Sequence, residues 1–71
     1  MKFLITGATG NIGSFLIDKI LSTGFKVNYL TRNQTKIKKS PNLNGFLWNP
    51  NKQTIDQKCF EDVTHIVHLS G

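Results

Sequence analysis

The 71-residue sequence lacks the cross-links that stabilise many small domains, because Cys59 is its single cysteine. One cysteine cannot form an intrachain disulfide, and small secreted domains usually depend on disulfides. Cys59, His65 and His68 do not make up a metal-ligand set, so we also expect no structural metal. These absences favour a protein of a reducing compartment over a disulfide-rich secreted domain.

Long apolar runs are missing as well. The amino terminus reads Met1-Lys2-Phe3-Leu4-Ile5 and then turns polar and glycine-rich, whereas a signal peptide needs an apolar run of about 7–15 residues. No stretch approaches the roughly 18 apolar residues that a membrane helix requires. We therefore expect a cytoplasmic protein with no membrane partner.

Acidic side chains are scarce, with four Asp and Glu against nine Lys and Arg, and the net charge is +5. No carboxylate occurs between Asp18 and Asp56, so the positive charge is concentrated in the amino-terminal part of the chain. Such a basic field favours an anionic partner, which includes nucleic acid, an acidic lipid surface and a phosphorylated small molecule. Composition alone leaves these three classes open.

The sequence does contain alternating strand and helix patterns. Helical periodicity runs from Asn11 to about Thr23, and Gly24 supplies the left-handed residue that commonly ends a helix. A second, short helix is expected within Asp56–Asp62. The expected strands are Lys2–Thr6, Phe25–Thr31, Gly45–Asn49 and Thr64–Leu69. The expected apolar stripe of the first helix consists of Ile12, Phe15, Leu16, Ile17, Ile20 and Leu21.

Strands that alternate with helices imply right-handed crossovers and a parallel sheet. Four strands in this rhythm predict an α/β fold, the first half of a Rossmann-like, doubly wound parallel sheet with strand order 3-2-1-4. A parallel sheet needs both faces covered, and an apolar strand at an open edge is prone to association. We therefore expect residues 1–71 to be the amino-terminal part of one dinucleotide-binding domain in a longer protein.

Three glycines lie at intervals of three residues between the first expected strand and the helix. Gly7 lets the chain turn sharply, Gly10 removes a side chain where the backbone meets a pyrophosphate, and Gly13 lets the helix pack closely on the sheet. Main-chain N–H groups and the positive end of the helix dipole then hold the phosphates. The alternative is a glycine-rich turn without a ligand. The predicted cofactor-binding residues of this loop are Gly7, Ala8, Thr9, Gly10, Asn11, Ile12 and Gly13.

The pattern Thr-Gly-x-x-Gly-x-x-Gly after a first strand resembles the signature of extended and atypical short-chain dehydrogenases/reductases. The chain as a whole is similar to the NAD(P)-dependent epimerase/dehydratase family, and most similar to its sugar-nucleotide epimerase-like branch. The shorter matches to that branch are Thr31-Arg32, Trp48-Asn49-Pro50, Ile55-Asp56 and Leu69-Ser70-Gly71. The resemblance implies a dinucleotide cofactor and, in the longer protein, a small substrate of the nucleotide-sugar type.

The second expected strand ends at Thr31-Arg32, where NAD-binding proteins carry an acidic residue that hydrogen-bonds the ribose 2′-hydroxyl. No carboxylate lies near this position in the sequence, and a guanidinium can pair bidentately with a 2′-phosphate. We therefore predict NADP rather than NAD, with Thr31 and Arg32 at the cofactor and Arg32 as the discriminating residue. The alternative is that Arg32 is a solvated charge at the strand end. Lys36, Lys38 and Lys39 add positive charge nearby, most often as a solvated face.

The fourth expected strand ends in Leu69-Ser70-Gly71, which the resemblance places against the adenosine ribose of the cofactor. His68 either approaches the cofactor or is satisfied by its neighbours in the strand. His65 and His68 are three residues apart on a strand and point to opposite faces, which argues against a shared metal. We interpret Trp48 as a packing residue and Cys59 as a small apolar residue without a lowered pKa.

The resemblance also implies a catalytic Tyr-x-x-x-Lys pair, in which the lysine lowers the pKa of the tyrosine. The single tyrosine is Tyr29, and Asn33 rather than lysine follows four residues later. We therefore predict a cofactor cradle without catalytic residues in this chain. The favoured function is the NADP-binding start of an epimerase or oxidoreductase. The alternatives are a non-catalytic nucleotide-binding or sensing module and a small nucleic-acid-binding protein, for which no recognition motif is present.

Overall fold

The computed structural model describes residues 1–7 and 10–69 of the chain. Its elements are β1 (Lys2–Thr6), α1 (Asn11–Ser22), β2 (Lys26–Thr31), the 3₁₀ helix η1 (Gln34–Lys36), β3 (Leu43–Asn49), β4 (Thr54–Ile55), the 3₁₀ helix η2 (Gln57–Phe60) and β5 (His65–His68). The strands form one sheet in the order β4-β3-β2-β1-β5. All neighbours pair in parallel except β3 and β4, which are antiparallel.

Four of these strands confirm the predicted Rossmann-like arrangement, because β3, β2, β1 and β5 lie side by side in the order 3-2-1-4, counted along the chain without β4.

Strand β4 was not predicted. After a turn at residues 50–53 the chain folds back on β3 and places Ile55 opposite Trp48. A strand of two residues is too short to show the alternation of polar and apolar side chains by which strands are recognised. Strand β3 also begins at Leu43, two residues before the expected start.

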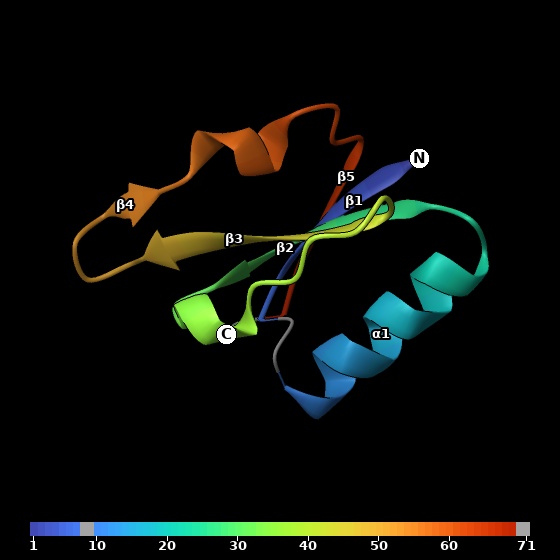
Figure 1. Cartoon of the computed structure of the whole chain (residues 1–71), viewed down its shortest axis with the longest axis horizontal. Helices are drawn as coiled ribbons and strands as arrows, with labels where there is room; N and C mark the ends of the chain where they lie inside the picture. Colours follow the sequence, from blue (N-terminus) through green and yellow to red (C-terminus); the bar gives the residue numbers. More distant parts are fainter. Residues whose placement is uncertain (8–9, 70–71) are drawn as a thin grey trace.

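Helix α1 covers one face of the sheet (Figure 1) with most of the expected stripe. Ile17 is buried, and Leu16, Ile20 and Leu21 pack against the same cluster. Ile12 and Phe15 are 75% and 65% exposed, whereas Gly13 and Ile17 are buried. Gly13 has no side chain, so the helix can approach the strands closely there. The expected stripe is therefore confirmed for four side chains and wrong for Ile12 and Phe15, while the burial of Gly13 agrees with its predicted packing on the sheet.

Two buried clusters lie on opposite faces of the sheet. The cluster on the α1 face consists of Ile5, Ile17, Val27 and Tyr29. The cluster on the η2 face consists of Leu4, Leu30 and Cys59, and Trp48 packs against it as predicted. Figure 1 shows α1 and the segment between β4 and β5 on opposite sides of the strands.

The short helix expected within Asp56–Asp62 is the 3₁₀ helix η2, and two polar side chains hold it. Asp56 begins it, and its Oδ1 accepts a hydrogen bond from the N–H of Lys58 at 3.0 Å. Asn28 lies buried in β2, and its Nδ2 donates to the carbonyl oxygen of Cys59 at 2.9 Å. The crossover from β4 to β5 is therefore attached directly to the centre of the sheet.

The predicted helix end is confirmed, because Gly24 has a φ of 86° and donates its N–H to the carbonyl oxygen of Leu21 at 3.0 Å.

Helix α1 has twelve residues. Within residues 1–7 and 10–69, no helix is both long enough and apolar enough to span a bilayer.

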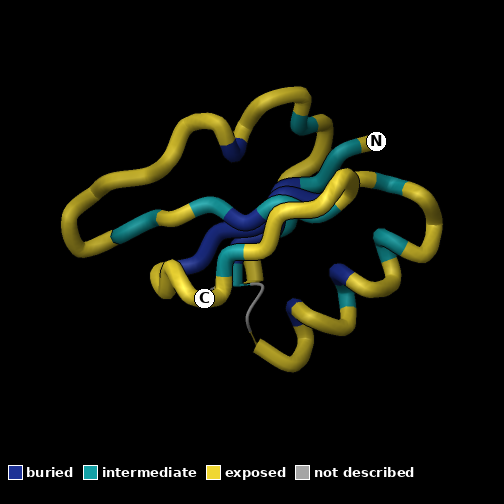
Figure 2. Tube along the Cα trace, viewed as in Figure 1, coloured by how far each residue is buried: buried dark blue, intermediate teal, exposed yellow. Residues whose placement is uncertain are grey.

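The outer edge of β3 is covered by the chain itself. The N–H of Gly45 donates to the carbonyl oxygen of Lys38, and the N–H of Ser40 donates to that of Leu43, both at 2.8 Å. Strand β4 covers the far part of the same edge. Strand β5 forms the opposite edge, where Ile66 is 62% exposed. Figure 2 shows that burial is concentrated in the strands between these edges.

Candidate functional site

The carboxyl ends of β1, β2 and β5 lie side by side along one rim of the sheet, because these strands are parallel. This rim crosses the strand ends and is distinct from the β3 and β5 edges. The glycine loop follows Thr6, Arg32 follows β2, and Leu69 follows β5. All three predicted cofactor-binding segments therefore start from this rim. Ligands of open α/β sheets bind beyond the carboxyl ends of the strands. Four predicted site residues lie outside the described ranges: Ala8, Thr9, Ser70 and Gly71.

The described part of the glycine loop leaves space next to Gly10. Gly7 has a φ of 74°, a left-handed value that side chains disfavour. Gly10 is extended at the start of α1, and no side chain of residues 1–7 or 10–69 caps this helix. A Cβ on Gly10 would have the carbonyl oxygen of Gly7, at 4.0 Å, as its nearest described neighbour. Asn11 and Ile12 are exposed in the first helical turn, whose N–H groups have no intrahelical partner.

At the end of β2, Thr31 is buried and Arg32 is exposed. The N–H of Asn33 donates to Oγ1 of Thr31 at 3.2 Å. The Oδ1 of Asn33 then accepts from the N–H and the hydroxyl of Thr35, at 3.0 and 2.6 Å. Side-chain hydrogen bonds therefore hold the main chain around Arg32, while its side chain remains exposed.

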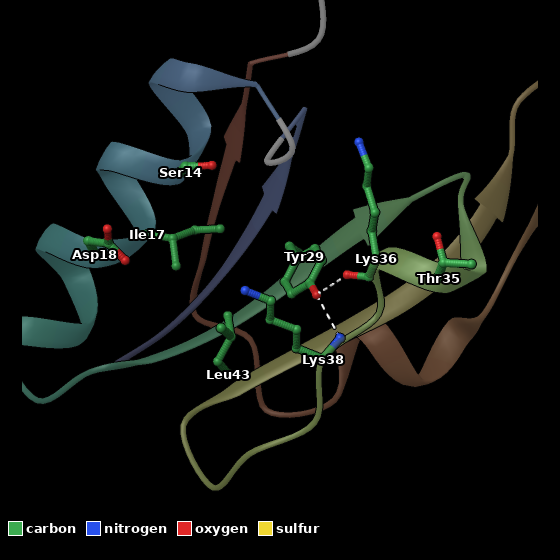
Figure 3. Close-up of a pocket in the computed structure, with 8 residues that line it drawn as sticks. All are labelled: Ser14, Ile17, Asp18, Tyr29, Thr35, Lys36, Lys38 and Leu43. Atoms are coloured by element: carbon green, nitrogen blue, oxygen red, sulfur yellow. Dashed lines mark hydrogen bonds between the residues drawn. The ribbon is translucent and has the colours of Figure 1, made fainter.

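A pocket of about 390 Å³ lies between α1 and the segment that follows β2 (Figure 3). It is lined by Ser14, Ile17, Asp18, Tyr29, Thr35, Lys36, Lys38 and Leu43. Two of the three predicted lysines therefore border the pocket. Lys39 does not, because its Nζ lies 4.1 Å from the centroid of the Phe46 ring.

Two parts of this pocket were not predicted from the sequence. Ser14 and Asp18 are four residues apart and therefore share a face of α1, a spacing that could have drawn attention to them. Tyr29 forms part of the pocket through its position opposite Gly45. That position depends on the register of β2 and β3, for which the sequence carries no local signal.

The two histidines of β5 are used within the sheet. His68 Nδ1 and Thr6 Oγ1 share a hydrogen bond of 2.7 Å, so His68 is satisfied by a neighbouring strand. His65 stacks on Phe3 with ring centroids 5.1 Å apart. The N–H of Leu69 donates to the carbonyl oxygen of Thr6 at 3.1 Å, which continues the pairing up to the predicted cofactor rim. In the described part of the chain, no three His, Cys, Asp or Glu residues are grouped as metal ligands would be.

Cys59 is buried in the cluster on the η2 face. Burial raises the pKa of the Cys59 thiol, and the nearby Asp56 carboxylate raises it further. The thiol therefore stays protonated at neutral pH and is a poor nucleophile. This confirms the interpretation of Cys59 as a small apolar residue.

The model of the NAD dependent epimerase/dehydratase family matches residues 3–71, which is nearly the whole chain. The chain belongs to this family. Among curated relatives, the divinyl chlorophyllide a 8-vinyl-reductase, chloroplastic, of Cucumis sativus is 34% identical over 70 residues. The match covers 92% of this chain and 15% of the relative, so the chain spans less than a fifth of that protein's length. No solved structure gives a significant match.

Members of the epimerase/dehydratase family use an NAD(P) dinucleotide as cofactor. The residues of this chain fit such a group on structural grounds. Among the described residues, only the carbonyl oxygen of Gly7 lies within 4.0 Å of a Cβ on Gly10 and no side chain caps the start of α1, where main-chain N–H groups can bind an anion. Exposed cationic side chains follow the neighbouring strand, at Arg32 and Lys36.

Proposed function

We propose that this epimerase/dehydratase-family chain binds NADP in preference to NAD. The observation that carries the proposal is the place of Arg32, which is exposed at the end of β2, next to the strand that leads into the glycine loop. In this position an acidic residue accepts a hydrogen bond from the ribose 2′-hydroxyl of NAD and would repel the 2′-phosphate of NADP. A guanidinium has the opposite preference, because it pairs with a phosphate through two parallel hydrogen bonds.

Each segment of the site has a distinct part in this proposal. The first N–H groups of α1 hold the pyrophosphate, and the space next to Gly10 lets it approach the backbone. Leu69, which follows β5, lies near the adenosine ribose. Lys36 and Lys38 add positive potential at the pocket. Asp18 is the acidic residue of the pocket lining, and it lies about one helical turn further from the start of α1 than Ser14 does. The bound dinucleotide supplies hydride-transfer chemistry.

We further propose that the chain is the amino-terminal part of a longer oxidoreductase or epimerase that acts on a small molecule of the nucleotide-sugar type. Two observations support this: the chain spans 15% of its curated relative, and Ile66 is exposed on the edge strand β5. Asn33 rather than lysine stands four residues after Tyr29, and the Tyr29 hydroxyl is hydrogen-bonded to main-chain groups of Lys36 and Lys38, which supports a catalytic pair outside this chain. Sequencing the transcript past Gly71 tests the proposal. A stop codon there, together with NADP binding, would favour a non-catalytic nucleotide-binding module.

The preference for NADP is tested by calorimetric titration of the full-length natural protein with NADP and NAD at two salt concentrations. Arg32→Ala should weaken NADP binding by about 10- to 100-fold, the range expected for hydrogen bonds to a charged group, and NAD binding by less than about twofold. Lys26→Ala is the matched control, because Lys26 is an exposed cation at the opposite end of the same strand. It should leave both affinities within about twofold of the wild type.

Three results would contradict the proposal. A folded protein that binds neither dinucleotide would remove the cofactor function. Equal binding of NADP and NAD, unchanged in Arg32→Ala, would retain a dinucleotide site but reject Arg32 as the residue that discriminates. A loss of affinity at higher salt that is equal in Arg32→Ala and Lys26→Ala would indicate a general effect of net charge.

A further inference from the structure

Tyr29 connects the sheet to the basic segment that borders the pocket. Its side chain lies on the α1 face of β2, and the residue is 4% exposed. Its hydroxyl donates a hydrogen bond to the carbonyl oxygen of Lys36 at 2.6 Å and accepts one from the N–H of Lys38 at 2.8 Å. Figure 3 shows both bonds as dashed lines. One side-chain atom therefore holds the main chain on both sides of Ile37.

The place of the Tyr29 ring depends on Gly45, which lies directly opposite in β3. A Cβ on Gly45 would come within 2.6 Å of Cζ and 2.7 Å of the hydroxyl oxygen of Tyr29. Non-bonded atoms do not approach this closely, so the ring occupies the space that the missing side chain leaves. The glycine thus allows the hydroxyl to reach the segment that contains Lys36 and Lys38.

Both lysines extend from this segment to the pocket, and Figure 3 shows the Lys38 side chain reaching towards α1. Their main-chain groups bond to the same hydroxyl, so the sheet determines where each side chain begins. A cation that is placed before binding loses less conformational entropy when it pairs with an anion. Fixing the segment in place therefore strengthens the binding of a phosphate at the pocket.

We infer that Tyr29 is a positioning residue whose hydroxyl places Lys36 and Lys38 at the pocket and thereby contributes to the preference for a dinucleotide with a 2′-phosphate. This inference rests on the proposed function, because the preference concerned is that for NADP over NAD. Tyr29 acts through the two lysines and not by contact with the phosphate, since its hydroxyl already makes one hydrogen bond as donor and one as acceptor.

The test is Tyr29→Phe in the full-length natural protein, which keeps the ring above Gly45 and removes the hydroxyl alone. Thr64→Val is a matched control, because the Thr64 hydroxyl also bridges a carbonyl and an N–H group, both of Lys2, at the amino end of the sheet. Tyr29→Phe should weaken NADP binding about tenfold and NAD binding less than about twofold, and Thr64→Val should leave their ratio unchanged. Amide hydrogen exchange at Lys38 should accelerate in Tyr29→Phe with or without a ligand.

The dependence on the lysines is tested by a double-mutant cycle. In a Lys36→Ala, Lys38→Ala background, Tyr29→Phe should no longer change the ratio of the NADP and NAD affinities. A change that persists there would show that Tyr29 acts by another route and would overturn the inference. Equal weakening of both dinucleotides by Tyr29→Phe would overturn it as well, because it would indicate a loss of structure without a role in selectivity.

The hydrogen-exchange measurement separates this inference from the proposed function. If Lys38 exchanges faster in Tyr29→Phe while the preference of the protein for NADP is unchanged, the inference is wrong and the proposed function stands. If the wild-type protein shows no preference for NADP, and Arg32→Ala has no effect, the proposed function fails and this inference fails with it.

Discussion

At the β3 edge of the sheet the chain folds back on itself twice, whereas at the β5 edge the described residues add no further strand. The segments that cover β3, residues 38–40 and β4, directly precede and follow it in the sequence. On the β5 side, by contrast, the described residues supply no such neighbour. One edge is thus completed by residues that are close in sequence, and the other is left as an edge strand within the described part of the chain.

The covered edge is also connected to the candidate site, because Lys38 takes part in both. Its carbonyl oxygen accepts from Gly45 in β3, and its N–H donates to the Tyr29 hydroxyl. Covering the edge of β3 therefore places a lysine at the pocket at the same time. The β5 edge meets the site only at its carboxyl end, through His68 and Leu69.

The largest effect on this comparison is expected from Gly45→Ala, which disturbs the covered edge. The added methyl group would meet the Tyr29 ring at 2.6 Å and push the hydroxyl away from Lys36 and Lys38. Overpacking of this kind typically costs about 1–3 kcal/mol in the free energy of unfolding. Urea denaturation followed by circular dichroism measures the loss. A change smaller than about 0.5 kcal/mol, the scatter of neutral surface substitutions, would mean that the ring moves without cost.

A second prediction concerns the β5 edge. An exposed apolar side chain on an edge strand promotes strand-to-strand association, so Ile66→Lys should weaken self-association about tenfold at little cost in stability. Leu47→Lys is the matched control, because Leu47 is also an exposed aliphatic residue but lies on the covered strand β3. Sedimentation velocity over a range of concentrations compares the three proteins. Equal effects of the two substitutions would remove the difference between the edges.

The smallest effect is expected from the titration of Cys59, which lies in the crossover between the two edges. Because the pKa of Cys59 is raised in the folded protein, the folded state holds this proton more tightly than the unfolded chain does. The resulting stability is complete below the ordinary pKa of 9.0 and is lost as the pH rises through the folded value. Urea denaturation at increasing pH should therefore show a lower stability in alkali. Cys59→Ala should lack this part of the decline, and an identical pH profile for both proteins would contradict it.

The parts of the fold that follow from short stretches of sequence were predicted well. Gly7 takes a positive φ after β1, Gly24 ends α1, and the parallel strands lie in the order 3-2-1-4. Each of these depends on backbone geometry or on the handedness of crossovers, which local residue types control. The buried side of α1 was predicted correctly except at Ile12 and Phe15, which satisfy the helical periodicity but are exposed at the start of the helix.

The sequence by itself determined the glycine loop, the absence of an acidic residue at the end of β2 and the basic charge of the segment that follows. These are properties of residue type and order, and they suffice to indicate a dinucleotide and to propose NADP. Only the tertiary structure decided that Tyr29 lies over Gly45, that Lys36 and Lys38 rather than Lys39 reach the pocket, and that β3 rather than β5 is covered. These contacts join residues that the register of the strands brings together, and a register is decided by packing across the whole sheet.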